Sequence, residues 1–272
     1  MALTAFQRDI CRLLAAHRRV RGESYVAGGV ALSVALDTQR LSRDLDLFHD
    51  TTQAVAASWD TDRVALESAG YAVMPIRERP GFVQATVLRG SDTLLVEWTR
   101  DSAFRFFPLV EHGELGLTLH PFDLAANKVL ALVGRAEVRD WVDVLMCDER
   151  VQAFGYLVWA ACGKDPGFTP HGLIDHARRS SHYSAPEVRS LAFEGSPPDA
   201  ALLAGRWHRI LLTADVIVGR LPAAHAGEVV LSRSGELFQG GPEELERELA
   251  GGGVRFHAGR LGGALPQITR LG

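Results

Sequence analysis

The sequence predicts an α/β (α+β) fold in which a mixed sheet with flanking helices is followed by a helical lobe and a small α/β tail. Within residues 1–150, short apolar strands alternate with amphipathic helical patterns, an order typical of a sheet covered by helices. Beyond that point the patterns are helical with few strand candidates, until strand-like segments return near residue 222. We therefore expect a core over 1–150, a helical lobe over 151–221 and a tail over 222–272.

The elements of the core follow from periodicity and from Gly and Pro signals. An amphipathic helix is expected over about 3–20, and Gly22 ends it. A strand over 24–27 then leads through a Gly28-Gly29 turn into a helix over about 30–37. The later core elements are a strand from Leu45 whose alternation includes Asp44 and Asp46, a helix over 52–70, three strands over 71–78, 82–89 and 93–100, and two helices over 123–135 and 137–148, the first with Asp123 at its N-cap after Pro121.

The second half of the chain is predicted to be mainly helical. Loops rich in Gly and Pro separate its segments, and no internal repeat is present. The expected elements are helices over 151–163, 171–180, 185–193 and 198–219, a hairpin within 227–240, a short helix over 242–249 and a strand over 253–259.

The composition is that of a globular protein, because 47% of the 272 residues are hydrophobic. The sequence contains no run of about 18 apolar residues, so no membrane span is expected. The net charge of −4 does not indicate a general nucleic-acid binder. A basic cluster of His17, Arg18, Arg19 and Arg21 is expected to be a solvated helix face, with an RNA-facing patch as the alternative. The N-terminus lacks signal-peptide features, and three widely spaced cysteines predict no disulfide framework, so a cytoplasmic location is expected.

Two carboxylates in one predicted strand indicate a cation site. Asp44 and Asp46 stand two residues apart, so both side chains point to the same face of the sheet. Paired carboxylates repel each other unless a cation lies between them, and Mg²⁺ prefers such oxygen ligands. Glu97, on a later strand, is the candidate for a third carboxylate in a site for two magnesium ions.

A glycine pair adds a candidate phosphate site. Gly28 and Gly29 lie between a strand and a helix N-terminus, where small residues let backbone N–H groups approach an anion. Each feature alone has an ordinary structural explanation, since Gly-Gly turns and Asp-x-Asp strands are common. The conjunction of the glycine pair, the two aspartates and a later acidic strand favours phosphoryl-transfer chemistry.

The same residues carry a family resemblance. GGVAL from Gly28 and RLSRDLDLF from Arg40 resemble the nucleotidyltransferase superfamily signature, in which a Gly-Gly or Gly-Ser pair precedes an Asp-x-Asp pair. The sequence is more closely similar to the AbiEii/AbiGii toxin family, the nucleotidyltransferase toxins of type IV toxin–antitoxin systems. This similarity spans roughly residues 24–150 and continues with Lys128, Arg135, Arg139, Asp140 and Asp143.

The resemblance implies a magnesium-dependent nucleotidyltransferase that moves a nucleotide from an NTP to an acceptor hydroxyl, on a tRNA 3′ end or a protein side chain. It also implies a phage-defence or toxin–antitoxin role with a cognate antitoxin. Two Mg²⁺ ions would be held by Asp44, Asp46 and Glu97. The implied catalytic residues are Asp44, Asp46, Glu97, Lys128 and Asp143, and the implied nucleotide-binding residues are Gly28, Gly29, Arg40, Ser42, Lys128 and Arg139.

Several alternatives stay open at this stage. The same metal site could serve a small-molecule, antibiotic-type nucleotidyltransferase, or the chain could be a catalytically silent nucleotide- or partner-binding protein. Lys128 could be a snorkelling helix lysine, and Arg139 and Asp143 could form an i,i+4 salt bridge. His49 is expected to be a strand-end residue with no metal-binding role.

Overall fold

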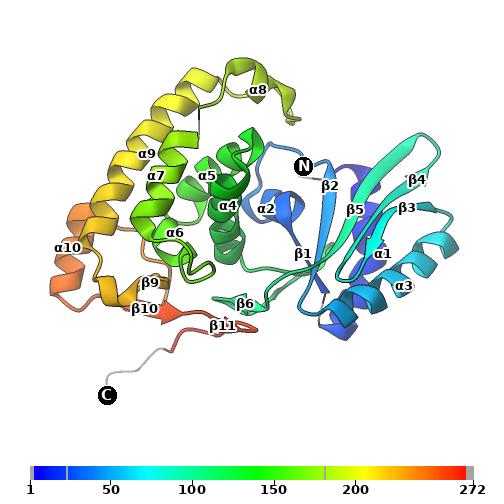
Figure 1. Ribbon diagram of the computed structural model, residues 1–272, viewed down its shortest axis with the longest axis horizontal. Helices are drawn as coiled ribbons and strands as arrows, with labels where there is room; N and C mark the ends of the chain where they lie inside the picture. Colours follow the sequence, from blue (N-terminus) through cyan, green and yellow to red (C-terminus); the bar gives the residue numbers. More distant parts are fainter. Residues whose placement is uncertain (1–2, 23, 181, 268–272) are drawn as a thin grey trace. The chain divides into compact units, whose positions relative to one another are not determined.

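The computed structural model describes residues 3–22, 24–180 and 182–267 and contains two compact units (Figure 1). The first unit comprises Met1–Ala103, Pro108–His120 and Ala192–Gly195. The second unit comprises Phe104–Phe107, Pro121–Leu191 and Ser196–Gly272. Among the described residues, none of the helices combines the length and apolar character needed to cross a membrane.

The first unit is built on a seven-stranded mixed sheet with strand order β3-β4-β5-β2-β1-β8-β7 (Figure 1), which confirms the predicted fold class. Strand β2 pairs in parallel with β5 and antiparallel with β1. Its strands are β1 (Ser24–Ala27), β2 (Asp44–His49), β3 (Ala72–Arg79), β4 (Phe82–Arg89), β5 (Asp92–Arg100), β7 (Val110–His112) and β8 (Gly116–Thr118), and its helices are α1 (Ala5–Arg21), α2 (Gly28–Leu36) and α3 (Thr52–Ser68). The two short strands β7 and β8 are absent from the sequence-based prediction.

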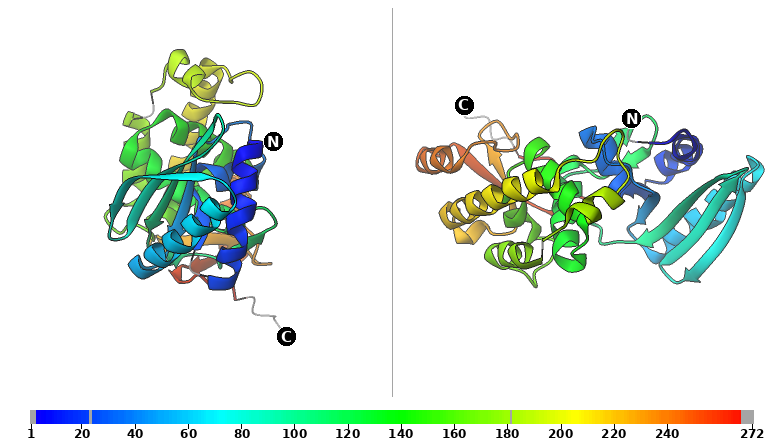
Figure 2. Two further views of the ribbon diagram at one scale, coloured as in Figure 1. Left: turned by 90° about the vertical axis from the view of Figure 1, so that its right-hand side faces the viewer. Right: turned by 90° about the horizontal axis from the view of Figure 1, so that it is seen from above.

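Alternation along the strands gives the sheet one apolar face and one polar face. Leu45 and Leu47 on β2 and Trp98 on β5 belong to the buried face, against which α1 and α3 pack side by side (Figure 2). The Trp98 ring lies 4.9 Å from that of Trp59 on α3, and its indole N–H donates to Asp62 at 2.9 Å. The opposite face therefore carries the half-buried polar positions, including both aspartates of β2.

Only part of the basic cluster on α1 is solvated: Arg19 is exposed, as predicted, whereas Arg18 is not. Arg18 is 1% exposed and donates to the backbone carbonyls of Leu115 and Cys11. His17 lies 3.0 Å from the Asp62 carboxylate, and the side chain of Arg21 lies outside the described residues. Helical periodicity could not reveal this burial, because the turn that covers Arg18 comes almost 100 residues later in the chain.

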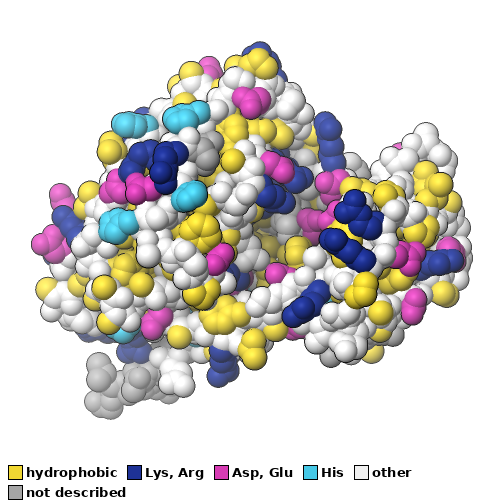
Figure 3. All heavy atoms as spheres, viewed as in Figure 1, with side chains coloured by type: hydrophobic (Ala, Val, Ile, Leu, Met, Phe, Trp, Pro, Cys, Tyr) yellow, Lys and Arg dark blue, Asp and Glu magenta, His cyan; other side chains and the backbone are white. Residues whose placement is uncertain are grey.

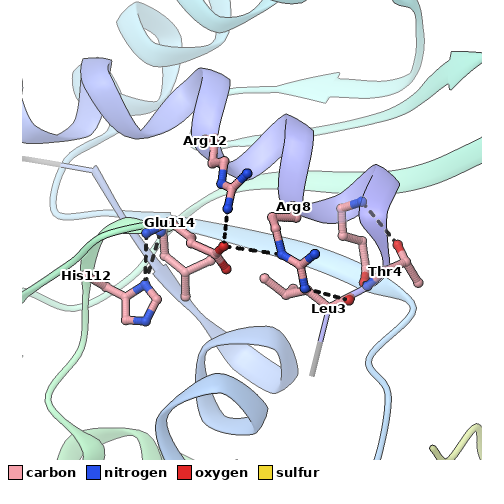
Figure 4. Close-up of polar contacts among 8 residues, drawn as sticks. Leu3, Thr4, Arg8, Arg12, His112 and Glu114 are labelled. Carbon is pink, nitrogen blue, oxygen red and sulfur yellow. Dashed lines mark hydrogen bonds and ion pairs between the residues drawn. The ribbon is translucent and has the colours of Figure 1, made fainter. Parts of the chain in front are cut away.

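That turn also binds the outer face of α1. The Glu114 carboxylate lies between Arg8, at 3.3 Å, and Arg12, at 2.6 Å, and His112 accepts backbone N–H bonds from the same turn (Figure 4). These ion pairs are partly exposed, so each contributes at most about 1 kcal/mol. Their main effect is to fix the position of α1 against this turn, and their contribution to the stability of the fold is small.

His49 closes β2 and is fully buried, which agrees with its prediction as a strand-end residue. Burial lowers the pKa of His49 from 6.5 to about 4. In the unfolded chain this imidazole binds a proton near pH 6.5, whereas the folded chain resists protonation until about pH 4. Stability is therefore lost as pH falls from about 6.5 towards 4.

We expect this one group to make the protein about 2 kcal/mol less stable at pH 5 than at pH 7.5. Urea unfolding at the two pH values measures the difference, and His49→Leu should remove it. His208→Asn, at an exposed helix position, should leave it unchanged. An equal pH dependence in wild type and His49→Leu would contradict the assignment.

The second unit is mainly helical. Helix α6 is buried along its whole length and packs against α4, α7 and α9. The elements are α4 (Pro121–Arg135), α5 (Val138–Arg150), α6 (Phe154–Ala161), α7 (Pro170–Ser180), α8 (Ala185–Ser190), α9 (Ala200–Arg220), η1 (Ala223–His225) and α10 (Pro242–Ala250), with strands β6 (Phe104–Arg105), β9 (Glu228–Ser232), β10 (Val254–Ala258) and β11 (Arg260–Leu261). Packing of α4 on α6 explains why the compact units divide near residue 120, whereas the predicted domain boundaries lie at 150 and 221.

Three local predictions are corrected in this half of the chain. Asp123 lies inside α4, after Pro121, and accepts the backbone N–H groups of Phe106 and Phe107 where a cap was expected. The hairpin predicted over 227–240 is reduced to one antiparallel bridge, Leu231–Leu237, with backbone hydrogen bonds from Ser232 N–H to Glu236 O and from Phe238 N–H to Val230 O, because β9 forms its full ladder with β10. The third predicted helix of the lobe ends at Ser190, since the residues that follow pair with another segment.

Candidate active site

Three carboxylates lie on the polar face of the sheet in the first unit. Asp46 on β2 and Glu97 on β5 are direct cross-strand partners, and Asp44 precedes Asp46 by two residues. Partners in register share a face, so all three half-buried side chains project from the same side. Glu97 accepts a 2.6 Å hydrogen bond from Gln84, its partner on β4. The predicted acidic constellation is thus brought to one surface.

The glycine pair adjoins these acids directly. Gly28 has φ +65°, and a Cβ atom at this position would overlap the Asp46 carboxylate. A Cβ on Gly29 would come within 2.5 Å of Ser42 Oγ and 2.9 Å of Arg40 Nη2. Only glycine leaves room for these neighbours, which explains the pair in physical terms.

The glycines are the first residues of α2, whereas the sequence pattern predicted a turn before the helix. The N-cap residue, Ala27, supplies no side-chain hydrogen bond to the helix N-terminus. The first N–H groups of a helix lack intrahelical partners and attract anions. This helix end, beside Asp46, has the chemistry expected for a phosphate cradle.

The loop that carries Arg40 and Ser42 is fixed from both sides. Ser33 Oγ donates to the Arg40 carbonyl at 3.0 Å, and Gln7 Nε2 donates to the Ser42 carbonyl at 2.7 Å. The segment 192–195 adds a bridge, through Leu41 N–H to Ala192 O at 2.9 Å. Sequence reasoning missed this segment, because the contact joins residues some 150 positions apart.

The remaining predicted site residues lie in the second unit. Lys128 on α4 is 7% exposed, and its Nζ lies 3.0 Å from Asp140 and 2.9 Å from Asp143 on α5. Arg135 also contacts Asp140 at 3.0 Å. A buried ammonium between two carboxylates is compensated within this unit, so the snorkelling alternative does not describe Lys128. In addition, Arg139 pairs with Glu137 at 2.6 Å.

Lys128→Met should destabilise the protein by about 2–3 kcal/mol, because two buried carboxylates lose their ammonium partner. Arg135 retains one contact with Asp140, which keeps the loss at the lower end of the usual range. Guanidinium chloride unfolding measures the effect, with Arg135→Ala as the control, expected below about 1 kcal/mol at this half-exposed position. A loss under 1 kcal/mol for Lys128→Met would contradict the structural role.

The acidic set has the donors that magnesium prefers. Among residues 3–22, 24–180 and 182–267, no group of three or more His, Cys, Asp or Glu side chains is arranged so that it could hold a metal ion by itself. Mg²⁺ does not require one, since it is usually held by one or two carboxylates together with water and substrate phosphates. Two aspartates and a glutamate on one face, beside the N-terminus of α2, supply oxygen donors of the type that this ion takes.

Comparisons with known proteins agree at the level of fold. No protein-family model matches the sequence, and no curated protein matches it. A solved H. pylori structure, provisionally assigned as a nucleotidyltransferase, is similar with a TM-score of 0.50 at 16% identity, over 81% of this chain and 97% of that one. At this identity the likeness shows that the two chains share a fold.

Two further solved structures are similar only with TM-scores below 0.5. JHP933 from Helicobacter pylori has a TM-score of 0.48 at 15% identity, with 78% of this chain and 90% of that chain covered. The Megavirus polyadenylate synthase has a TM-score of 0.40 at 11% identity, with 55% and 32% covered.

Proposed function

We propose that this chain is a magnesium-dependent nucleotidyltransferase that moves a nucleotide from an NTP to an acceptor hydroxyl. One observation carries the proposal: Asp46 is seated against Gly28 at the N-terminus of α2, with Asp44 and Glu97 on the same sheet face. A carboxylate set beside an anion-binding helix end would place a cation against phosphate.

Two groups of residues in the first unit would have different roles, one in binding phosphate and one in binding magnesium. The N–H groups of Gly28 and Gly29 would bind phosphate oxygens, and Ser42 and Arg40 lie against Gly29 to add a hydroxyl and a positive charge. Asp44, Asp46 and Glu97 would hold magnesium. When bound, magnesium neutralises phosphate charge and makes the acceptor hydroxyl easier to deprotonate.

Glu97 would act on the acceptor hydroxyl. It lies on β5, across β2 from the glycines, and its hydrogen bond from Gln84 fixes its orientation. An ionised carboxylate held in this way can take up the proton that leaves the attacking hydroxyl. In-line transfer then releases pyrophosphate on the opposite side.

The finer assignments belong to the proposal as well. Contacts between nucleotide and Lys128 or Arg139, and a catalytic role for Asp143, rest on the resemblance to the AbiEii/AbiGii toxins. A tRNA 3′ end or a protein side chain as acceptor and an antitoxin partner rest on the same resemblance, and a cytoplasmic location rests on the cysteine spacing and the N-terminal sequence. The buried ion cluster gives Lys128 and Asp143 a structural role in either case.

Nucleotide transfer is tested by incubating the purified chain with each α-labelled NTP and Mg²⁺. Separate reactions offer total RNA, a cell protein extract and a panel of aminoglycosides, which separates macromolecular from small-molecule transfer. We expect label in one acceptor class with matching pyrophosphate release, abolished by EDTA. Absence of transfer to all three classes, with no NTP binding by calorimetry, would reject the proposal.

A further inference from the structure

A strip of exposed basic side chains continues the acid-bearing face of the sheet. Across β2, β5, β4 and β3, the register joins Asp46, Glu97, Gln84 and Arg77 in one row. Partners in register share a face, and the Gln84–Glu97 hydrogen bond confirms this for the central pair. In the space-filling view, basic side chains gather beside acidic ones over this part of the sheet (Figure 3).

A β-bulge determines which side chains belong to the strip. The β3–β4 register shifts between Pro75 and Arg77, so Met74 and Arg77 share a face although they are three residues apart. Unbroken alternation would place Arg77 and Arg79 on the other face of the sheet. The bulge turns both guanidinium groups towards the side that carries the acids.

Neither guanidinium is neutralised within the described part of the chain. Arg77 and Arg79 are exposed and form no ion pair there, and Arg79 lies 4.9 Å over the ring of Phe82 on β4. Phe82 pairs with Thr99 on β5 and shares the acid-bearing face. Two cations beside an aromatic platform suit a ligand that carries both phosphates and planar bases.

The in-line geometry of the proposed transfer would place the acceptor over the part of the sheet that carries the basic strip. The glycine cradle follows β1, on one side of β2, whereas Glu97 and the basic strip lie on the other side. Attacking and leaving oxygens are roughly in line in phosphoryl transfer. If pyrophosphate leaves over the glycines, the acceptor must approach over β5, β4 and β3.

We infer that the strip formed by Met74, Arg77, Arg79 and Phe82 binds the acceptor, and that this acceptor is the end of a single-stranded nucleic acid. The inference rests on the proposed function and selects one acceptor class for it. Three strand spacings separate β2 from β3, about 14 Å, so the strip contacts nucleotides behind the reacting end. Because the net charge of the whole chain is −4, the positive charge that attracts the phosphates of the acceptor comes from this strip and not from the protein as a whole.

Fluorescence anisotropy with a labelled 12-nucleotide single-stranded RNA tests the strip without catalysis. We expect Arg77→Ala/Arg79→Ala to bind roughly 10- to 100-fold more weakly than wild type. Loss of two phosphate contacts should also make the slope of log K against log salt less negative by about 1.4. Arg63→Ala/Arg209→Ala removes the same charge, from α3 on the covered face and from α9, and should bind as wild type does.

Several outcomes would overturn the inference. Equal RNA affinity in wild type and Arg77→Ala/Arg79→Ala would do so, as would preference for a 12-residue polyglutamate peptide or binding of neither probe. The variant Asp46→Ala distinguishes a failure of the inferred RNA-binding strip from a failure of the proposed nucleotidyltransferase function. If Asp46→Ala and wild type transfer label equally, the enzyme assignment fails, whereas arginine-dependent RNA binding would still support the strip.

Discussion

Asp46→Ala should abolish nucleotide transfer, with a loss of at least about 10³-fold in rate, equivalent to roughly 4 kcal/mol of transition-state stabilisation. Asp46 is the carboxylate that contacts the glycine cradle and is also the cross-strand partner of Glu97. Among the residues that the structure describes, no other acid combines the two positions. Pyrophosphate release and incorporation of labelled nucleotide measure the loss.

The fold of Asp46→Ala should stay intact. Asp44 lies on the same face two residues away, so the repulsion relieved by removing one carboxylate offsets the contacts that are lost with it, and the melting temperature should stay close to that of wild type. Asp92→Ala is the matched control, because Asp92 is an exposed acid at the start of β5 and its loss should change activity less than about twofold. More than a tenth of wild-type activity in Asp46→Ala, with normal folding, would refute the metal-binding role.

The sequence predicts the site best where its spacing and its periodicity agree. Two aspartates at strand spacing require one face, and the β2–β5 pairing supplies Glu97 to that face in register. The glycine pair follows from the same logic, although the helix begins two residues earlier than the pattern indicated. Local rules suffice here because each inference spans only a few residues or one strand pair.

The same local rules fail where contacts between distant parts of the chain decide the structure. Arg18 looks like a surface arginine until the turn near Leu115 covers it, and segment 192–195 pairs with a loop 150 residues earlier. The β3 bulge is equally hidden, since strand alternation alone predicts that Arg77 points away from the acids. Such features depend on register and tertiary contact, which no periodicity encodes.

Gly28→Ala should reduce transfer by more than about 10²-fold and destabilise the protein by roughly 2–4 kcal/mol. Two causes combine: a left-handed backbone costs a non-glycine residue about 1–2 kcal/mol, and the new methyl group would overlap the Asp46 carboxylate. The carboxylate must then move away from the cradle, which separates the cation site from the phosphate site.

Gly90→Ala isolates the backbone cost, because Gly90 has φ +63° and nothing within 4 Å of an added Cβ. It should lose about 1–2 kcal/mol and keep full activity. In Gly28→Ala/Asp46→Ala the carboxylate is gone and only the Cβ of residue 46 remains, 3.1 Å from the new methyl group, so stability should recover most of the way to the Gly90→Ala level while transfer stays absent. If instead Gly28→Ala and Gly90→Ala behave alike in both measurements, the contact between glycine and carboxylate has no functional part, and the cradle would have to lie elsewhere on the sheet.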